Sequence, residues 1–190
     1  MVAIDTETTG LSLTRDRLCL VQISTGNGKC HLIQFKKSLD GAPYQSANQL
    51  RLLLKDSSIT KLFHYGRFDL GMLAQWIGPV NGPVYCTKIA SKLARTNTDR
   101  HGLKDLCHDL IGVELLKEHQ SSDWGSEKLT EEQLQYAAGD VLYLHQLKTA
   151  LDIMLEREGR KQLAESCFLA LKTRVQLDLG GWLNEDIFSH

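Results

Sequence analysis

The sequence lacks the basic excess that is typical of proteins binding long nucleic acids by charge alone. Its 190 residues carry 22 Lys and Arg against 23 Asp and Glu, a formal net charge of −1 at pH 7. Tracking a phosphate backbone needs many cationic side chains along one surface. Any phosphate-bearing ligand of this protein should therefore be short and held at a local site, with metal ions supplying positive charge.

Features of secreted, membrane-bound or zinc-binding proteins are also scarce. The five cysteines are scattered and form no Cys-x-x-Cys pair, so neither a zinc knuckle nor a redox motif is indicated. No charged segment followed by an apolar core opens the chain, and no apolar run is long enough to cross a membrane. We therefore expect a cytoplasmic protein with reduced thiols and no membrane partner.

Three prolines and fifteen glycines leave no room for a long disordered linker, and the length suits one domain. Alternating and turn-forming residues predict a hairpin of strands over residues 17–24 and 30–35, joined at Gly26-Asn27-Gly28. Further strands are expected at 59–64 and 84–86, and helices at 68–77, 87–95, after Gly102, from 130 towards 155, and at 161–171. A hairpin followed by crossovers predicts an α/β fold with a mixed sheet.

The first eleven residues place two acidic residues at the end of an apolar run. Side chains two positions apart in a strand share a face, so Asp5 and Glu7 should stand side by side. Adjacent carboxylates repel unless positive charge lies between them, and a divalent metal commonly supplies it. An isolated Asp-x-Glu is more often a strand end with two solvated acids, so its meaning depends on further ligands.

Two later stretches can supply those ligands. Asp69 lies in the first turn of a predicted helix, where the helix dipole also favours an ordinary capping acid. Tyr136 and Asp140 are four residues apart on the helix from 130, so they share a face. Gly139 beside them costs roughly 1 kcal/mol relative to Ala in a helix. Either a close approach of this face or ordinary helix packing would explain that glycine.

Asp5-x-Glu7, His64-x4-Asp69 and Tyr136-x3-Asp140 resemble, in order and spacing, the three motifs of the DEDD exonuclease superfamily, tyrosine subtype. The resemblance to the ribonuclease D branch covers almost the whole chain, and within it the chain is most similar to the nanoRNase C group of diribonucleotidases. The matching stretches are 5–11, 17–22, 66–70, 87–93, 98–104, 122–124, 136–144 and 177–188. The resemblance implies a ribonuclease H-like mixed five-stranded sheet flanked by helices, the DnaQ-like exonuclease fold.

The chemistry implied by the family is phosphodiester hydrolysis with two divalent cations about 3.5–4 Å apart. Asp5 would bridge the ions, and Glu7, Asp69 and Asp140 would share the remaining positions. Since all four ligands are oxygen donors, Mg²⁺ or Mn²⁺ suits the site better than zinc. Tyr136 is a poor base at its ordinary pKa of roughly 10, so its implied role is to orient the attacking water.

The resemblance also implies substrate contacts. Thr6 and Leu11, in and after the Asp-x-Glu motif, would face the terminal nucleotides, and Leu11 matches a leucine that wedges between two bases. The alternative for Leu11 is that it packs the loop. Trp124 would support the site or stack on a base, with a buried core indole as the alternative. The candidates for contact with phosphate oxygens are His64, Arg67, Arg100, His101 and Lys104. Arg100 and Lys104 are favoured, and a solvated helix face is the alternative for part of the basic run that contains them.

Several features depart from the ribonuclease D pattern. Helical RNA-binding domains follow the nuclease in ribonuclease D, and the sequence has no room for them before His190, which argues against a processive or tRNA-maturing role. Residues 125–128, Gly-Ser-Glu-Lys, replace the Arg-Pro that often follows Ser-Asp-Trp, which leaves the substrate geometry there open. Asp5 also lies closer to the start of the chain than it does in relatives. A truncated start of the sequence would explain this position.

We expect an exonuclease domain over residues 1–172 and a tail over residues 173–190. From residue 175 the tail carries spaced apolar residues without a helical period, so it should dock on its own domain or on a neighbouring subunit. The resemblance implies a ring-like homo-octamer, and an intramolecular tail is the alternative.

The predicted function is that of a metal-dependent 3′-5′ exoribonuclease hydrolysing dinucleotides and short oligoribonucleotides to nucleoside 5′-monophosphates. A broader ribonuclease D-like exonuclease, acting on longer RNA or on DNA, including single-stranded DNA, is the alternative enzyme. A non-catalytic nuclease-like module that binds nucleic acid is a third hypothesis. Such modules typically lose one of the acids, and all four are present here.

Overall fold

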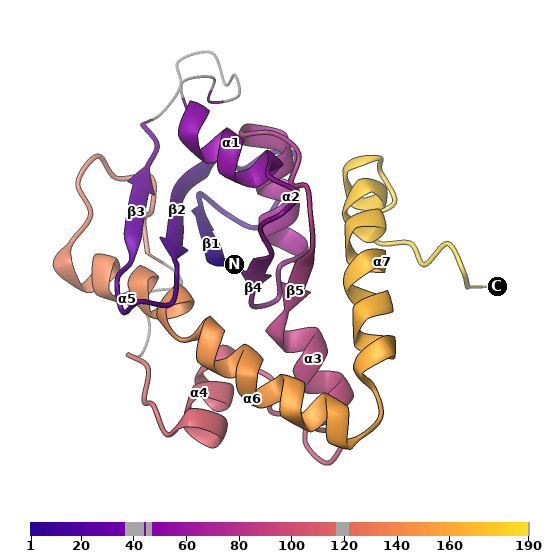
Figure 1. Ribbon diagram of the computed structural model, residues 1–190. Helices are drawn as coiled ribbons and strands as arrows, with labels where there is room; N and C mark the ends of the chain where they lie inside the picture. The colour runs from indigo at the N-terminus through magenta and orange to yellow at the C-terminus, as the bar shows by residue number, and fades with distance from the viewer. Residues whose placement is uncertain (37–43, 45–46, 117–121, 190) are drawn as a thin grey trace.

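A mixed sheet forms the centre of the protein, in a computed structural model that describes residues 1–36, 44, 47–116 and 122–189. Within those residues five strands pair in the order β3-β2-β1-β4-β5 (Figure 1). Their bounds are β1 Val2–Thr8, β2 Leu18–Ser24, β3 His31–Gln34, β4 Lys61–Phe63 and β5 Val84–Cys86. Strand β1 is antiparallel to β2 and parallel to β4. The prediction of a mixed five-stranded sheet is confirmed.

The hairpin between β2 and β3 forms at the predicted turn. Gly26 and Gly28 adopt φ values of 81° and 77°, a left-handed conformation that glycine reaches without steric cost. The turn brings the return strand back antiparallel to β2. All seven residues of β2 are buried, as expected for a strand covered on both faces.

Seven helices occur in the described residues, and five of them begin within one residue of a start predicted from the sequence. They are α1 Asn48–Lys55, α2 Arg67–Trp76, α3 Thr87–Ala94, α4 Leu103–Ile111, α5 Glu131–Leu142, α6 Leu144–Arg157 and α7 Lys161–Leu179. Helix α5 begins at a capping box in which the Thr130 and Gln133 side chains each bond the other's backbone N–H. No described helix has the length and apolar character needed to cross a bilayer.

The prediction of one helix from residue 130 towards 155 is wrong, because the helix is interrupted at Tyr143. Tyr143 adopts φ −104° and ψ −4°, between the end of α5 and the start of α6. Helix α5 packs on β1 and β2, whereas α6 packs on α3 and α4. The two helices on either side of Tyr143 therefore pack on different elements.

The prediction that residues from 175 lack helical structure is also wrong, because α7 continues to Leu179 and so passes through the expected boundary at 172/173. Its buried positions alternate steps of four and three, which is a helical period. They are Ala164, Phe168, Leu171, Val175 and Asp178. This helical pattern was not recognised in the sequence because its last buried position, Asp178, is a charged residue. In Figure 1 α7 stands beside α2 and β5, against which it packs.

Candidate active site

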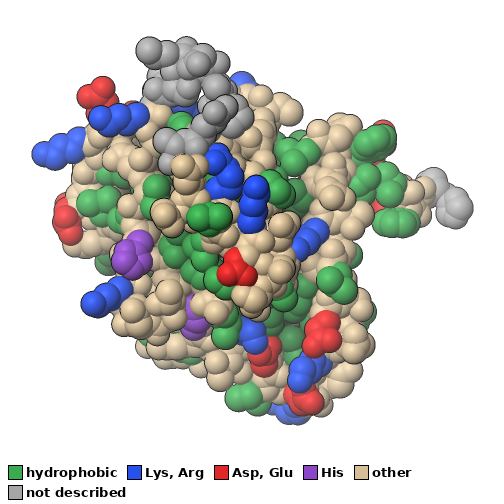
Figure 2. Space-filling view, turned by 45° about the horizontal axis from the view of Figure 1, so that its top comes forward, with side chains coloured by type: hydrophobic (Ala, Val, Ile, Leu, Met, Phe, Trp, Pro, Cys, Tyr) green, Lys and Arg blue, Asp and Glu red, His purple; other side chains and the backbone are tan. Residues whose placement is uncertain are grey.

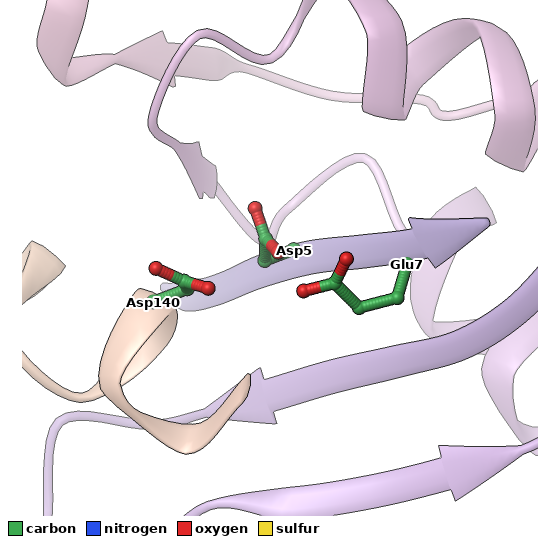
Figure 3. Close-up of side chains that lie close together, drawn as sticks. All are labelled: Asp5, Glu7 and Asp140. Carbon is green, nitrogen blue, oxygen red and sulfur yellow. The ribbon is translucent and has the colours of Figure 1, made fainter. Parts of the chain in front are cut away.

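Three carboxylates from two elements converge at the centre of the sheet. Asp5 and Glu7 project from the same face of β1, and Asp140 reaches them from α5. Ligand oxygens of the three lie within 4.8 Å of one another. Figure 3 shows the side chains meeting in one space between β1 and α5. The fold thus brings together residues that are 135 positions apart in the chain (Asp5 and Asp140).

Asp69 adjoins this group from the first turn of α2. Its Oδ1 accepts a hydrogen bond of 2.6 Å from the Thr6 hydroxyl. Both residues are buried. Asp69 is not one of the three carboxylates whose oxygens lie within 4.8 Å of one another, but its charge contributes to the raised pKa of Asp5. Thr6, expected to face a nucleotide, has its hydroxyl engaged by Asp69.

The electrostatics of the four carboxylates oppose ionisation. Burial raises the pKa of all of them: Asp5 well above its usual range, Glu7 to about 9, Asp140 to about 7 and Asp69 to about 6. Repulsion between neighbouring carboxylates adds to the effect for Asp5, Glu7 and Asp140. A divalent cation would remove both penalties, and a donor set made only of carboxylate oxygens fits Mg²⁺ or Mn²⁺.

Gln22 is a member of the site that the sequence reasoning missed. It is buried on β2 directly opposite Asp5. Its Nε2 donates to Asp5 Oδ2 at 3.3 Å and to Glu7 Oε1 at 3.4 Å. Its Oε1 has no hydrogen-bond partner among the residues that the structure describes. A glutamine inside a strand buried along its whole length was the available signal, since such an amide needs partners.

Tyr136 lies one helical turn before Asp140 on α5 and is half-buried. Burial, with the charges of Asp140, Glu7 and Asp5, raises its pKa, so the phenol stays protonated at neutral pH. Its ring lies 6.2 Å from the ring of Trp124, centre to centre. Trp124 is only 3% exposed and packs in a small core cluster. This burial agrees with the alternative that Trp124 is a core indole, and it leaves almost no surface of the ring open to a base.

The other expected substrate contacts differ in their exposure and in their hydrogen-bond partners. Leu11 is 83% exposed in the loop after β1, so it does not pack that loop. His64 shares a hydrogen bond of 2.9 Å with the Thr87 hydroxyl. Burial, aided by Lys88, lowers the pKa of His64 to about 3, so its imidazole is neutral at physiological pH.

The cationic candidates differ in their partners. The Arg67 guanidinium binds Asp178, with Nε 2.6 Å from Oδ2. Arg100 pairs with Asp105 at 2.9 Å on the exposed side of α4. Lys104 is exposed on the same helix. The structure therefore joins two of the three cations to carboxylates of the chain itself.

Comparison with known proteins identifies the domain. A family model described as 3′-5′ exonuclease matches residues 1–156. Ribonuclease D from Gluconacetobacter diazotrophicus is 33% identical over 159 residues, which are 84% of this chain and 39% of that protein. DNA polymerase I from Aquifex aeolicus is 35% identical over 172 residues, 90% of this chain and 26% of that protein. The chain thus spans well under half of these curated relatives.

Solved structures give the same answer. NrnC from Brucella melitensis superposes with a TM-score of 0.93 at 57% identity, covering 100% of this chain and 89% of that one. Structures of that protein bound to pGG and with bound Mg²⁺ also match. Escherichia coli RNase D superposes with a TM-score of 0.78 at 29% identity, covering 92% of this chain and 44% of that one. The resemblance read from the sequence is confirmed. The chain belongs to the 3′-5′ exonuclease family, and it is a 3′-5′ exonuclease of the ribonuclease D and NrnC type.

Proposed function

We propose that this exonuclease is a metal-dependent exoribonuclease that hydrolyses dinucleotides and short oligoribonucleotides to nucleoside 5′-monophosphates. The convergence of Asp5, Glu7 and Asp140, with Asp69 beside them, is the observation that carries the proposal. The match to NrnC, which has been solved bound to pGG, supports a short substrate. The net charge of −1 supports it too, because a long backbone would need a larger cationic surface.

The four carboxylates would hold two divalent cations, Mg²⁺ or Mn²⁺. When bound, such ions activate a water molecule and neutralise charge on the phosphate and the leaving oxygen. Gln22 holds Asp5 and Glu7 side by side through its amide N–H groups. The Thr6 hydroxyl fixes the rotamer of Asp69. The Mg²⁺-bound structure of NrnC supports this choice of ion.

Tyr136 and Leu11 would act on the water and the substrate. Because the Tyr136 phenol stays protonated, it can hold the attacking water by a hydrogen bond and does not serve as the base. The exposed side chain of Leu11 would insert between two bases. Lys104 is the exposed cation that we propose for phosphate contact, whereas the ion pairs of Arg67 and Arg100 argue for structural roles.

We also propose that the chain assembles as a homo-oligomer, an octamer by its resemblance to the nanoRNase C group. Residues after α7 expose apolar side chains that one chain leaves uncovered. Figure 2 shows hydrophobic side chains gathered at the C-terminal end of the molecule, at the right of the view. The exposed residues are Trp182, Leu183, Ile187 and Phe188. Such a cluster is costly in water, so contact with a neighbouring subunit is favoured.

The deciding experiment compares cleavage of a labelled diribonucleotide, a twenty-nucleotide RNA and a single-stranded DNA, each with Mg²⁺, with Mn²⁺ and with EDTA. We expect the fastest cleavage on the diribonucleotide, and none with EDTA. Equal or faster cleavage of the long substrates would favour the broader exonuclease that ribonuclease D and DNA polymerase I relatives suggest. Intact substrates throughout would reject the enzyme function proposed here. A Leu11→Ala variant should lose rate on the diribonucleotide more than on the long RNA.

A further inference from the structure

An ion-pair network joins the end of α7 to the first turn of α2. The Asp178 side chain is 0% exposed, although it carries a charge. Arg67 donates to it from Nε at 2.6 Å and from Nη2 at 2.7 Å. Arg174 donates from Nε at 2.9 Å and from Nη2 at 2.7 Å. Burial alone would raise the pKa of Asp178, but the hydrogen bonds from both arginines outweigh it and lower the pKa, so the carboxylate stays ionised.

The same arginines hold the chain that follows α7. Arg67 Nη2 donates to the Leu183 carbonyl at 2.9 Å, and Arg174 Nη1 donates to the Glu185 carbonyl at 2.8 Å. Arg174 Nη2 also donates to the Trp182 carbonyl. One buried carboxylate therefore fixes three segments relative to each other: the start of α2, the end of α7 and the chain after it.

The start of α2 receives little restraint from its own sequence. Gly66 occupies the N-cap position and supplies no side-chain hydrogen bond to the helix. Tyr65, just before it, adopts φ 60°, which is uncommon for a residue other than glycine. Asp69 lies in this first turn, two residues after Arg67, and its side chain is also held by the Thr6 hydroxyl at 2.6 Å. A displacement of the turn would therefore move Asp69 away from Asp5.

We propose that Asp178 is a positioning residue for Asp69: it clamps Arg67 and so holds the first turn of α2 where Asp69 completes the carboxylate cluster. The inference rests on the proposed role of Asp69 as a metal ligand. Helix α7 lies outside residues 1–156, which match the exonuclease family model, so the clamp is supplied by sequence beyond the matched domain. Supporting residues of this kind are important because the position of a ligand sets the affinity of a metal site.

Three variants test the clamp. Asp178→Asn removes the charge and keeps the shape, and Arg174→Gln weakens the network but leaves the Arg67–Asp178 pair intact. Arg160→Gln is the matched control, because Arg160 Nη1 donates to the Leu93 carbonyl at 2.7 Å and ties the opposite end of α7 to α3. Each purified protein is measured for amide hydrogen exchange in residues 63–72 without metal, and for the Mg²⁺ concentration that gives half of the maximal increase in Tm.

Asp178→Asn should speed exchange in the first turn of α2 and raise the required Mg²⁺ concentration roughly tenfold. Arg174→Gln should do the same to a smaller extent, and it carries the test if Asp178→Asn does not fold. Arg160→Gln should leave both quantities unchanged. On the diribonucleotide, Asp178→Asn should lower kcat at fixed Mg²⁺ while KM changes little.

The clamp would be rejected if the Asp178 and Arg174 variants bound Mg²⁺ like the wild type, or if Arg160→Gln shifted Mg²⁺ binding equally. A rise in KM alone in the Asp178→Asn variant would also reject the clamp. It would indicate that the Arg67 side chain contacts the substrate and does not position Asp69. Failure of the proposed function would look different. The wild type would then leave every substrate intact, while the exchange of residues 63–72 would still report whether Asp178 holds the turn.

Discussion

Individual carboxylates at this site are arranged for ligand binding at the expense of stability. A folded-state pKa raised above the unfolded value means that the folded protein prefers the protonated acid. Below the unfolded-state pKa values, 3.8 for Asp and 4.5 for Glu, these acids are protonated and impose no penalty on the folded protein. The free energy of unfolding then falls as pH rises through the folded-state pKa values, about 7 for Asp140 and about 9 for Glu7. The metal-free protein should therefore lose stability between roughly pH 5 and pH 9.

Asp140→Asn should reverse part of this loss. With EDTA at pH 8 we expect the substitution to raise the free energy of unfolding by about 2 kcal/mol, because it removes one buried charge from a repelling group. At pH 5 the difference should shrink, since Asp140, with a pKa of about 7, is then already protonated. Added Mg²⁺ should stabilise the wild type but not the variant, and cleavage should be abolished. Urea unfolding at both pH values measures these effects.

The matched control is Glu156→Gln, at an exposed ion pair between α6 and Lys161 of α7. It should change stability little at either pH and keep the response to Mg²⁺. A metal-free Asp140→Asn protein that was less stable than the wild type at pH 8 would contradict the account of mutual repulsion.

The shared faces of Asp5 with Glu7 and of Tyr136 with Asp140 could be predicted from local spacing, whereas their convergence was expected only from the family resemblance. A spacing of two in a strand and of four in a helix fixes the shared face before any tertiary contact is known. Gln22 could not be assigned in this way, because its role depends on the register that sets it opposite Asp5. The pairing of Arg67 with Asp178 was equally hidden, since 111 positions separate the two residues. From the sequence, Arg67 was expected to contact phosphate only because it lies within the His64-x4-Asp69 motif.

At the scale of secondary-structure elements, α5 carries both Tyr136 and Asp140 and contains a glycine beside them. A Cβ added at Gly139 would meet nothing closer than Leu115 Cδ2, at 3.8 Å. Close packing within the described chain therefore does not require this glycine. The break at Tyr143 and the length of α7 escaped prediction for a related reason. Both depend on which layer each helix packs against, which the local period does not encode.

Gly139→Ala should raise the free energy of unfolding by about 0.5–1 kcal/mol, because alanine is the better helix former and the space is open. Chemical denaturation measures this change. Gly112→Ala is the control, since Gly112 ends α4 at φ 67°, and a side chain there should lower stability. Diribonucleotide cleavage by Gly139→Ala shows what the space is for. Full activity would show that the substrate does not need this space either, whereas a fall in kcat/KM without lost stability would show that the substrate occupies it.

At the scale of the whole molecule, two features stand together: a carboxylate site in a protein without a basic excess, and an exposed apolar C-terminal segment. The C-terminal residues are held to the body by the arginines of the Asp178 network, so their apolar side chains are presented in a fixed place. A fixed apolar surface suits a permanent contact better than a loose tail does, since no ordering entropy is lost on association. Subunits meeting there would restrict access to the site and favour short substrates.

Replacing Ile187 and Phe188 together by serine should convert the proposed oligomer to smaller species. Phe188 is 86% exposed in the single chain, so the change removes intersubunit burial without opening the monomer core. Light scattering coupled to size exclusion gives the molar mass, and Leu52→Ser, at an exposed leucine on α1, is the control. We expect the control to keep the wild-type mass, while the double variant loses mass and its preference for the diribonucleotide over the twenty-nucleotide RNA. A wild type that runs as a monomer, or a double variant of unchanged mass, would show that these residues do not assemble the protein.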